Sequence, residues 1–92
     1  MKISKIIWKE ENVEHIGKHK ITPQEVETLC FDDVPKIKKG KGNTYYILGQ
    51  TDSGRYLFVV ARLWRKGAIY IITARDMDTK EKKLYKKLIG GK

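Results

Sequence analysis

The chain has 92 residues, of which 40% are hydrophobic and 34% are charged. This length suits one domain, and the apolar share is sufficient for a core, so we expect residues 1–92 to form a single ordered domain. No apolar run approaches the roughly 20 residues that a membrane span needs, and no secretory signal is evident. The single cysteine excludes an internal disulfide, and we expect a cytoplasmic protein that does not engage a membrane.

The charge is strongly positive. Twenty Lys and Arg residues against eleven Asp and Glu residues leave a net charge of +9. Such a surplus favours a polyanionic partner, which is nucleic acid, an acidic protein or, less often, a membrane surface. An ordinary basic protein with a solvated lysine coat is the alternative, and charge alone leaves both open.

Two short elements are predicted at the start of the chain. Residues 2–9 alternate loosely between apolar and polar and indicate a first strand. Residues 10–19 are polar, but Val13 and Ile16 are three apart, as on one face of a helix.

The next helix has a well-defined start. Thr22, Pro23 and Glu25 occupy the N-cap, N1 and N3 positions of a capping box. One face of this helix carries Val26, Leu29 and Cys30. We therefore expect Cys30 to be a core residue and not a reactive thiol.

From Pro35 onward the pattern indicates strands separated by glycine-containing turns. The predicted strands are residues 36–38, 45–48, 56–64 and 68–74. Consecutive strands with short turns form an antiparallel β-meander.

A last helix follows this meander. Asp78 or Thr79 caps it, and Glu81 can complete the capping box. Its apolar stripe consists of Leu84, Tyr85 and Leu88. The predicted fold is therefore α+β, with an antiparallel β-meander packed against two N-terminal helices and one C-terminal helix.

Strong catalytic motifs are missing from the sequence. There is no phosphate-binding glycine loop, no serine elbow and no HExxH zinc motif. His15 and His19 are four residues apart and share a helical face if that helix continues. Nothing indicates a third metal ligand, so we expect no metal and no cofactor.

Arginines within strands are more informative. Only four arginines stand against sixteen lysines. With an even-numbered loop, Arg62 would pair opposite Ile71, and Arg75 would lie on the same face about 13 Å further along. Two guanidinium groups at this spacing could hold neighbouring phosphates. Alternatively, each pairs with a carboxylate such as Glu25 or Glu27 from a packed helix.

Several segments resemble the BrnT family of bacterial toxins, in the family's order. They are Lys18-His19 with Ile21-Thr22, residues 46–51 (YILGQT), residues 54–60 (GRYLFVV) and residues 71–75 (IITAR). The last of these, followed by Glu81 and Tyr85, is similar to the family's "I-I-[ST]-A-R…E…Y" ending. Trp8 and Asn12 match part of its opening.

The resemblance implies a RelE-like fold and a small, metal-independent ribonuclease that arrests translation. It also implies a cognate antitoxin of the BrnA type, through whose DNA-binding part the complex would contact DNA only indirectly. Two alternatives remain: a non-catalytic relative that binds RNA or ribosomes, and a basic interaction module that acts mainly through its antitoxin.

Metal-free RNA cleavage needs a base, an acid and cations that stabilise the phosphorane. We expect His19 to be the acid or base, because histidine is the side chain that titrates near neutral pH. Capping helix carbonyls is its alternative role. Arg62 and Arg75 are the expected catalytic cations.

Further candidates for RNA or phosphate binding are Lys18, Arg55, Tyr85 and Trp8. Arg55 is otherwise plain surface charge, and Tyr85 is otherwise a packing residue. Trp8 and Trp64 could stack on bases, although a tryptophan in a small domain more often packs in the core. The chain departs from the family at Lys20, where a glycine commonly follows Lys-His, and in residues 40–43 and 62–65.

Overall fold

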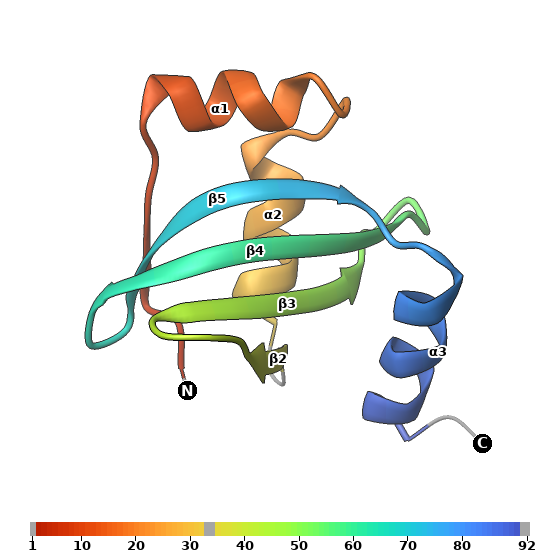
Figure 1. Cartoon of the computed structure of the whole chain (residues 1–92). Helices are drawn as coiled ribbons and strands as arrows, with labels where there is room; N and C mark the ends of the chain where they lie inside the picture. Colours follow the sequence, from red (N-terminus) through yellow and green to blue (C-terminus); the bar gives the residue numbers. More distant parts are fainter. Residues whose placement is uncertain (1, 33–34, 91–92) are drawn as a thin grey trace.

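A computed structural model describes residues 2–32 and 35–90 (Figure 1). The elements are, in order, β1 (Lys5–Ile7), α1 (Glu10–Gly17), α2 (Pro23–Cys30), β2 (Lys36–Lys39), β3 (Thr44–Gln50), β4 (Tyr56–Arg65), β5 (Ala68–Asp76) and α3 (Thr79–Leu88). The strand order in the sheet is β1-β5-β4-β3-β2. Strands β2 to β5 form the expected antiparallel meander, whereas β1 pairs parallel to β5 and makes the sheet mixed. The α+β arrangement with its three helices is confirmed.

Capping boxes start two of the helices, as predicted. At α2, the Glu25 N–H donates to Thr22 Oγ1 at 3.2 Å, and the Thr22 N–H donates to the Glu25 carboxylate at 3.0 Å. At α3, Asp78 is the N-cap and forms the same reciprocal pair with Glu81. These bonds satisfy backbone donors that the first helical turn leaves without partners. None of the helices in the described part of the chain is long and apolar enough to cross a membrane.

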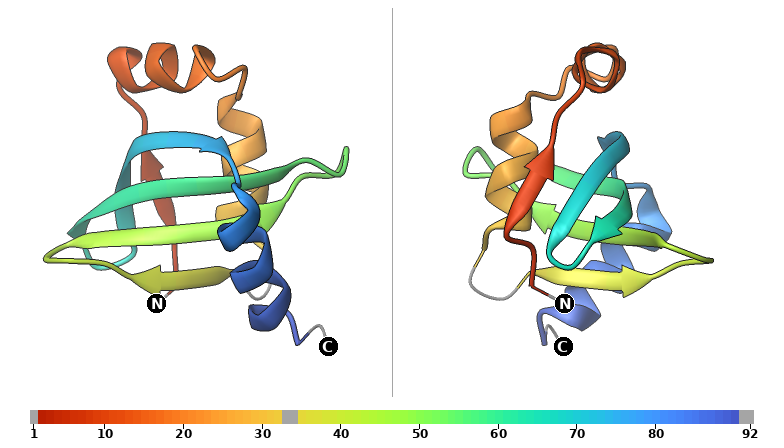
Figure 2. Two further views of the ribbon diagram at one scale, coloured as in Figure 1. Left: turned by 45° about the vertical axis from the view of Figure 1, so that its right-hand side comes forward. Right: turned by 90° about the vertical axis from the view of Figure 1, so that its left-hand side faces the viewer.

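Helix α2 covers one face of the sheet, as the two views of Figure 2 show, and the core lies between them. Its fully buried strand residues include Ile47, Leu57, Val59, Ile69 and Ile71. The helix packs closely on β3, since a Cβ at Gly49 would lie 2.5 Å from Leu29 Cγ. Cys30 is in this core, and burial raises the pKa of its thiol to about 12, with a smaller contribution from Glu27.

The opposite face of the sheet is only partly covered. Helix α3 lies across one end of it, where the ring of Tyr85 meets that of Tyr56 edge to face at 6.0 Å. Strand β1 pairs only with the first residues of β5, and helix α1 lies along the same edge of β5 after β1 ends (Figure 1). We call the strip between α1 and α3 the open face. Its residues are Phe58, Val60, Arg62, Tyr70, Thr73 and Arg75.

Candidate functional site

Two β-bulges set the side chains of the open face. Arg62 pairs opposite Tyr70, not opposite Ile71 as the loop length predicted. The shift arises because Trp64 is an extra residue of β4 between the pairs Leu63–Ile69 and Arg65–Ala68. A turn of two residues alone would have given the predicted register, so the bulge is the physical reason for the difference.

A second bulge restores the register further along β5. Between Val60 and Ala61 the partner strand skips Ile72, so that Val60 pairs with Thr73 and Phe58 with Arg75. Phe58 and Arg62 are four residues apart on one face of β4, about 13 Å at 3.3 Å per residue. The prediction that Arg62 and Arg75 share a face is therefore confirmed.

Arg75 is held in place by a carboxylate. Its Nη1 and Nη2 donate to the two carboxylate oxygens of Glu81 at 2.8 and 2.7 Å, and its guanidinium lies 4.7 Å from the centroid of the Phe58 ring. The helix that supplies the partner is α3, whereas the sequence suggested Glu25 or Glu27 of α2. This pairing favours a structural contribution of Arg75, which fastens α3 to the end of β5.

Arg55 is the centre of a second network. It donates to Asp76 from Nε at 2.6 Å and from Nη2 at 3.1 Å. It also donates to the backbone carbonyls of His19 and Lys20, and Glu25 Oε1 is 3.8 Å away. The hydrogen bonds from Arg55 are the main reason why the pKa of Asp76 lies below its usual value. Arg55 thus joins the corner between α1 and α2 to the end of β5.

Arg62 differs from both. Its side chain is exposed, and within residues 2–32 and 35–90 it forms no hydrogen bond or ion pair. It borders a pocket of about 360 Å³ between the start of α1 and the outer side of β5. An unpaired guanidinium beside a pocket is available for an anionic ligand.

The two histidines lie at the α1 border of the open face. His15 Nε2 is 3.1 Å from the hydroxyl of Thr73, a residue of the open face. The ring of His19 is edge to face with that of His15 at 6.0 Å. The structure therefore brings His19 next to His15, and of the two it is His15 that reaches the sheet.

The remaining predicted residues are dispersed. Lys18 is exposed at the C-cap of α1. Trp8 is partly buried against the core, and its indole N–H donates to Glu27 at 3.2 Å, so it lies on the α2 side of the sheet. Tyr85 packs on Tyr56, and burial raises its pKa. For Trp8 and Tyr85 the sequence left two roles open, RNA binding and packing, and these contacts favour packing.

An aromatic and cationic cluster was not expected from the sequence. Lys9 Nζ is 5.0 Å from the centroid of the Tyr70 ring, which meets Trp64 edge to face at 6.1 Å. The guanidinium of Arg65 stacks on Trp64 at 3.8 Å. Tyr70 reads as an ordinary strand residue, and Lys9 is one of sixteen lysines, so only the folded register brings the four together.

Among the described residues, no group of three or more His, Cys, Asp or Glu is close enough to hold a metal ion. What the open face offers to a ligand is the Arg62 guanidinium and, at its α1 border, the His15 ring, both suited to a phosphate. The pocket beside Arg62 has room for a further part of the same ligand.

The family model described as "Ribonuclease toxin, BrnT, of type II toxin-antitoxin system" matches residues 8–81. The chain is also similar to the crystal structure of the Brucella abortus ribonuclease toxin BrnT, at 20% sequence identity and a TM-score of 0.64. That similarity covers 82% of this chain and 97% of the other, and it supports the same fold. No curated protein sequence matches this chain.

Proposed function

The chain belongs to the BrnT family of ribonuclease toxins of type II toxin–antitoxin systems, and we propose that it cleaves RNA on the open face of its sheet. The proposal treats residues 1–92 as one toxin domain. The observation that carries it is the exposed Arg62, which has no partner among the described residues and lies between the pocket and the rest of the open face.

Electrostatics supports this placement. Arg55 and Arg75 are each paired with a carboxylate, whereas in the described part of the chain no carboxylate offsets the charge of Arg62, and the chain as a whole has a net charge of +9. The planar guanidinium matches the geometry of a phosphate group, and it stabilises the charge that develops on phosphorus during cleavage. We assign Arg62 the role of binding the scissile phosphate.

The proposed reaction needs no metal. The 2′-oxygen attacks the adjacent phosphorus, a bond between them forms, and the bond from phosphorus to the 5′-oxygen breaks. A base takes the 2′-hydroxyl proton, and an acid gives a proton to the departing 5′-oxygen. The products are a 2′,3′-cyclic phosphate and a 5′-hydroxyl end.

The histidine pair supplies the proton transfers in this proposal. The sequence favoured His19 as the acid or base because of the chemistry of histidine, not because of the family resemblance. His15 is the better placed of the two, because its ring reaches Thr73 on the open face while His19 lies behind it at the α1–α2 corner. Replacing each histidine separately tells which one acts.

The other predicted residues have supporting roles. Lys18 attracts the RNA backbone at the end of α1. Arg55 and Arg75 each hold a carboxylate, so they position the α1–α2 corner and α3 respectively. Trp8 contacts Glu27 and Tyr85 contacts Tyr56, so we assign both mainly to packing and only secondarily to RNA contact.

The biological setting follows the family. A ribonuclease toxin of a type II system has RNA as its substrate and a cognate antitoxin as its partner. We propose that the antitoxin is BrnA-like, that it contacts DNA on behalf of the complex, and that the toxin arrests translation in the cytoplasm. Growth arrest on expression, relieved by a co-expressed antitoxin, is the corresponding observation in cells.

The decisive experiment measures cleavage of single-stranded RNA by the purified protein in excess EDTA. Arg62→Gln should lower the cleavage rate by about 100-fold, the scale of losing one transition-state charge contact. Lys86→Gln removes the same charge from an exposed position in the last turn of α3 and should leave the rate near that of the parent. Thermal unfolding shows whether each variant is folded. Equal cleavage by both variants, or no cleavage by the parent, contradicts the proposal.

A further inference from the structure

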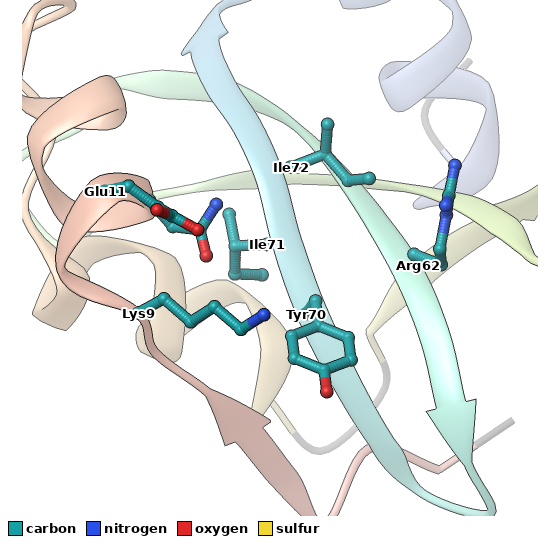
Figure 3. A pocket seen from close by; sticks show the side chains of 7 residues that line it. Lys9, Glu11, Arg62, Tyr70, Ile71 and Ile72 are labelled. Atoms are coloured by element: carbon teal, nitrogen blue, oxygen red, sulfur yellow. The ribbon is translucent and has the colours of Figure 1, made fainter.

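The pocket beside Arg62 has a composition that phosphate binding alone does not explain. Figure 3 shows Lys9 and Glu11 on the α1 side, Arg62 on the β4 side, and residues 70–72 of β5 between them. Asn12 completes the lining. The volume of about 360 Å³ is sufficient for one nucleotide.

The middle of this pocket is apolar. Ile72 is 40% exposed, because it follows the buried Ile71 and therefore lies on the opposite face of the sheet, where the bulge leaves it without a partner residue in β4. The ring of Tyr70 lies next to it in the strand. An exposed isoleucine beside an aromatic ring offers a flat contact surface for an unpaired base.

The polar part of the pocket is unusual for a site that binds a polyanion. Glu11 places a carboxylate there, and in the described part of the chain neither Glu11 nor Asn12 forms a side-chain hydrogen bond or ion pair. A carboxylate repels phosphate, so its presence needs a compensating donor. Its position in the first turn of α1 also suits the helix dipole, but Glu10 in the same turn provides that without lining the pocket.

We propose that this pocket binds a guanine base of the RNA, with the Glu11 carboxylate accepting hydrogen bonds from the base edge while Arg62 holds the adjoining phosphate. Guanine presents its ring N1–H and its exocyclic N2 amino group side by side, and two carboxylate oxygens accept both. Uracil offers a single N–H that lies between two carbonyl oxygens, and the carboxylate repels both of these oxygens. The site thus selects the base next to the scissile bond.

This inference rests on the proposed cleavage on the open face, but its test does not need cleavage. Nucleoside 3′-monophosphates place a base and its 3′-phosphate in the required relation. We would titrate the isotopically labelled protein with 3′-GMP and with 3′-UMP and follow the Ile72 methyl and Asn12 amide signals. We expect 3′-GMP to bind at least about fivefold more tightly than 3′-UMP, the lower limit for one good bidentate base contact.

Two variants in the same helical turn separate recognition from helix stability. Glu11→Gln should abolish the preference for 3′-GMP, whereas Glu10→Gln should retain it. Equal binding of the two nucleotides by the parent, or an unchanged preference in Glu11→Gln, overturns the inference even if the protein cleaves RNA in an Arg62-dependent way. A Glu11-dependent preference without any RNA cleavage supports the pocket assignment and contradicts the proposed function instead.

Discussion

Arg55 and Asp76 form a two-pronged ion pair, with Nε to Oδ1 at 2.6 Å and Nη2 to Oδ2 at 3.1 Å. The same guanidinium donates to the carbonyl oxygens of His19 at 2.8 Å and Lys20 at 2.5 Å. The turn between β3 and β4, the end of β5 and the α1–α2 corner are therefore joined through one side chain. Since His19 belongs to that corner, the network also fixes where the histidine pair stands relative to the open face.

The first prediction concerns the unequal partners of this network. Asp76→Asn removes the ion pair only, and we expect a loss of about 0.5–1 kcal/mol of unfolding free energy, because the Asp76 side chain is 63% exposed. Arg55→Gln also removes the donors to two backbone carbonyls and should cost about 1 kcal/mol more. Urea unfolding of both single variants and the double variant measures the coupling. Additive losses would show that the two side chains do not stabilise each other.

The second prediction is the pH dependence of stability. The pKa of Asp76 is lowered in the folded state, chiefly by its hydrogen bonds from Arg55. The full contribution is present above the ordinary aspartate pKa, and it is lost as the pH falls through the folded value, because the unfolded state takes up the proton first. Asp76→Asn should therefore show a shallower loss of unfolding free energy between pH 5 and pH 3. Asp52→Asn, in the exposed β3–β4 turn, should behave as the parent does.

The third prediction concerns Lys20, a non-glycine residue with a φ of +59°. Hydrogen bonds from the Ile21 N–H to the Ile16 carbonyl and from the Lys20 N–H to the Gly17 carbonyl end α1 in a Schellman motif, which favours glycine at the position of Lys20. Lys20→Gly should raise the unfolding free energy by about 0.5–1 kcal/mol by relieving the left-handed backbone. Lys18→Gly, at a right-handed position of the same turn, should lower it. Stabilisation by both would contradict the explanation.

Local signals in the sequence predicted much of the fold. Both capping boxes, the meander and the core position of Cys30 follow from short-range spacing, and the structure confirms them. The departure from the family at Lys20 is also understandable, because the glycine common there suits a positive φ. Propensity and spacing within about ten residues were sufficient for these features.

Features that depend on distant pairing were less accessible. The parallel pairing of β1 with β5 joins segments more than sixty residues apart, and three residues are too few to indicate it. The two bulges could not be seen in alternation patterns, so the partner of Arg62 was displaced by one residue. The carboxylate partners of Arg55 and Arg75 likewise depend on where the fold places Asp76, at the end of β5, and Glu81, in the first turn of α3. The site assignments themselves stay predictions.

The fourth prediction is that the thiol of Cys30 is unreactive in the folded protein. The side chain is 1% exposed, and burial raises its pKa to about 12. At pH 8 a thiol reagent should modify the native protein at least about 1000-fold more slowly than the urea-unfolded chain, because the reagent reaches Cys30 only when the protein unfolds locally or globally. The unfolded thiol ionises first as the pH rises, so stability should also decrease above pH 9. Rapid native labelling without loss of structure would contradict the burial.

The fifth prediction separates the two roles open to Arg75. If its main contribution is to fasten α3, then Arg75→Ala should lower the unfolding free energy by about 1 kcal/mol. Glu81→Ala should cost more, because it also removes the capping-box acceptor of the Asp78 N–H, and the double variant should lose little more than Glu81→Ala alone. Cleavage by folded Glu81→Ala then decides the catalytic role. That variant frees the Arg75 guanidinium on the open face, so a catalytic Arg75 predicts cleavage at or above the parent rate, with a further loss of at least tenfold in the Arg75→Ala/Glu81→Ala double variant. Equal cleavage by Glu81→Ala and the double variant would leave Arg75 a positioning residue, and Arg62 would be the cation that meets the phosphate.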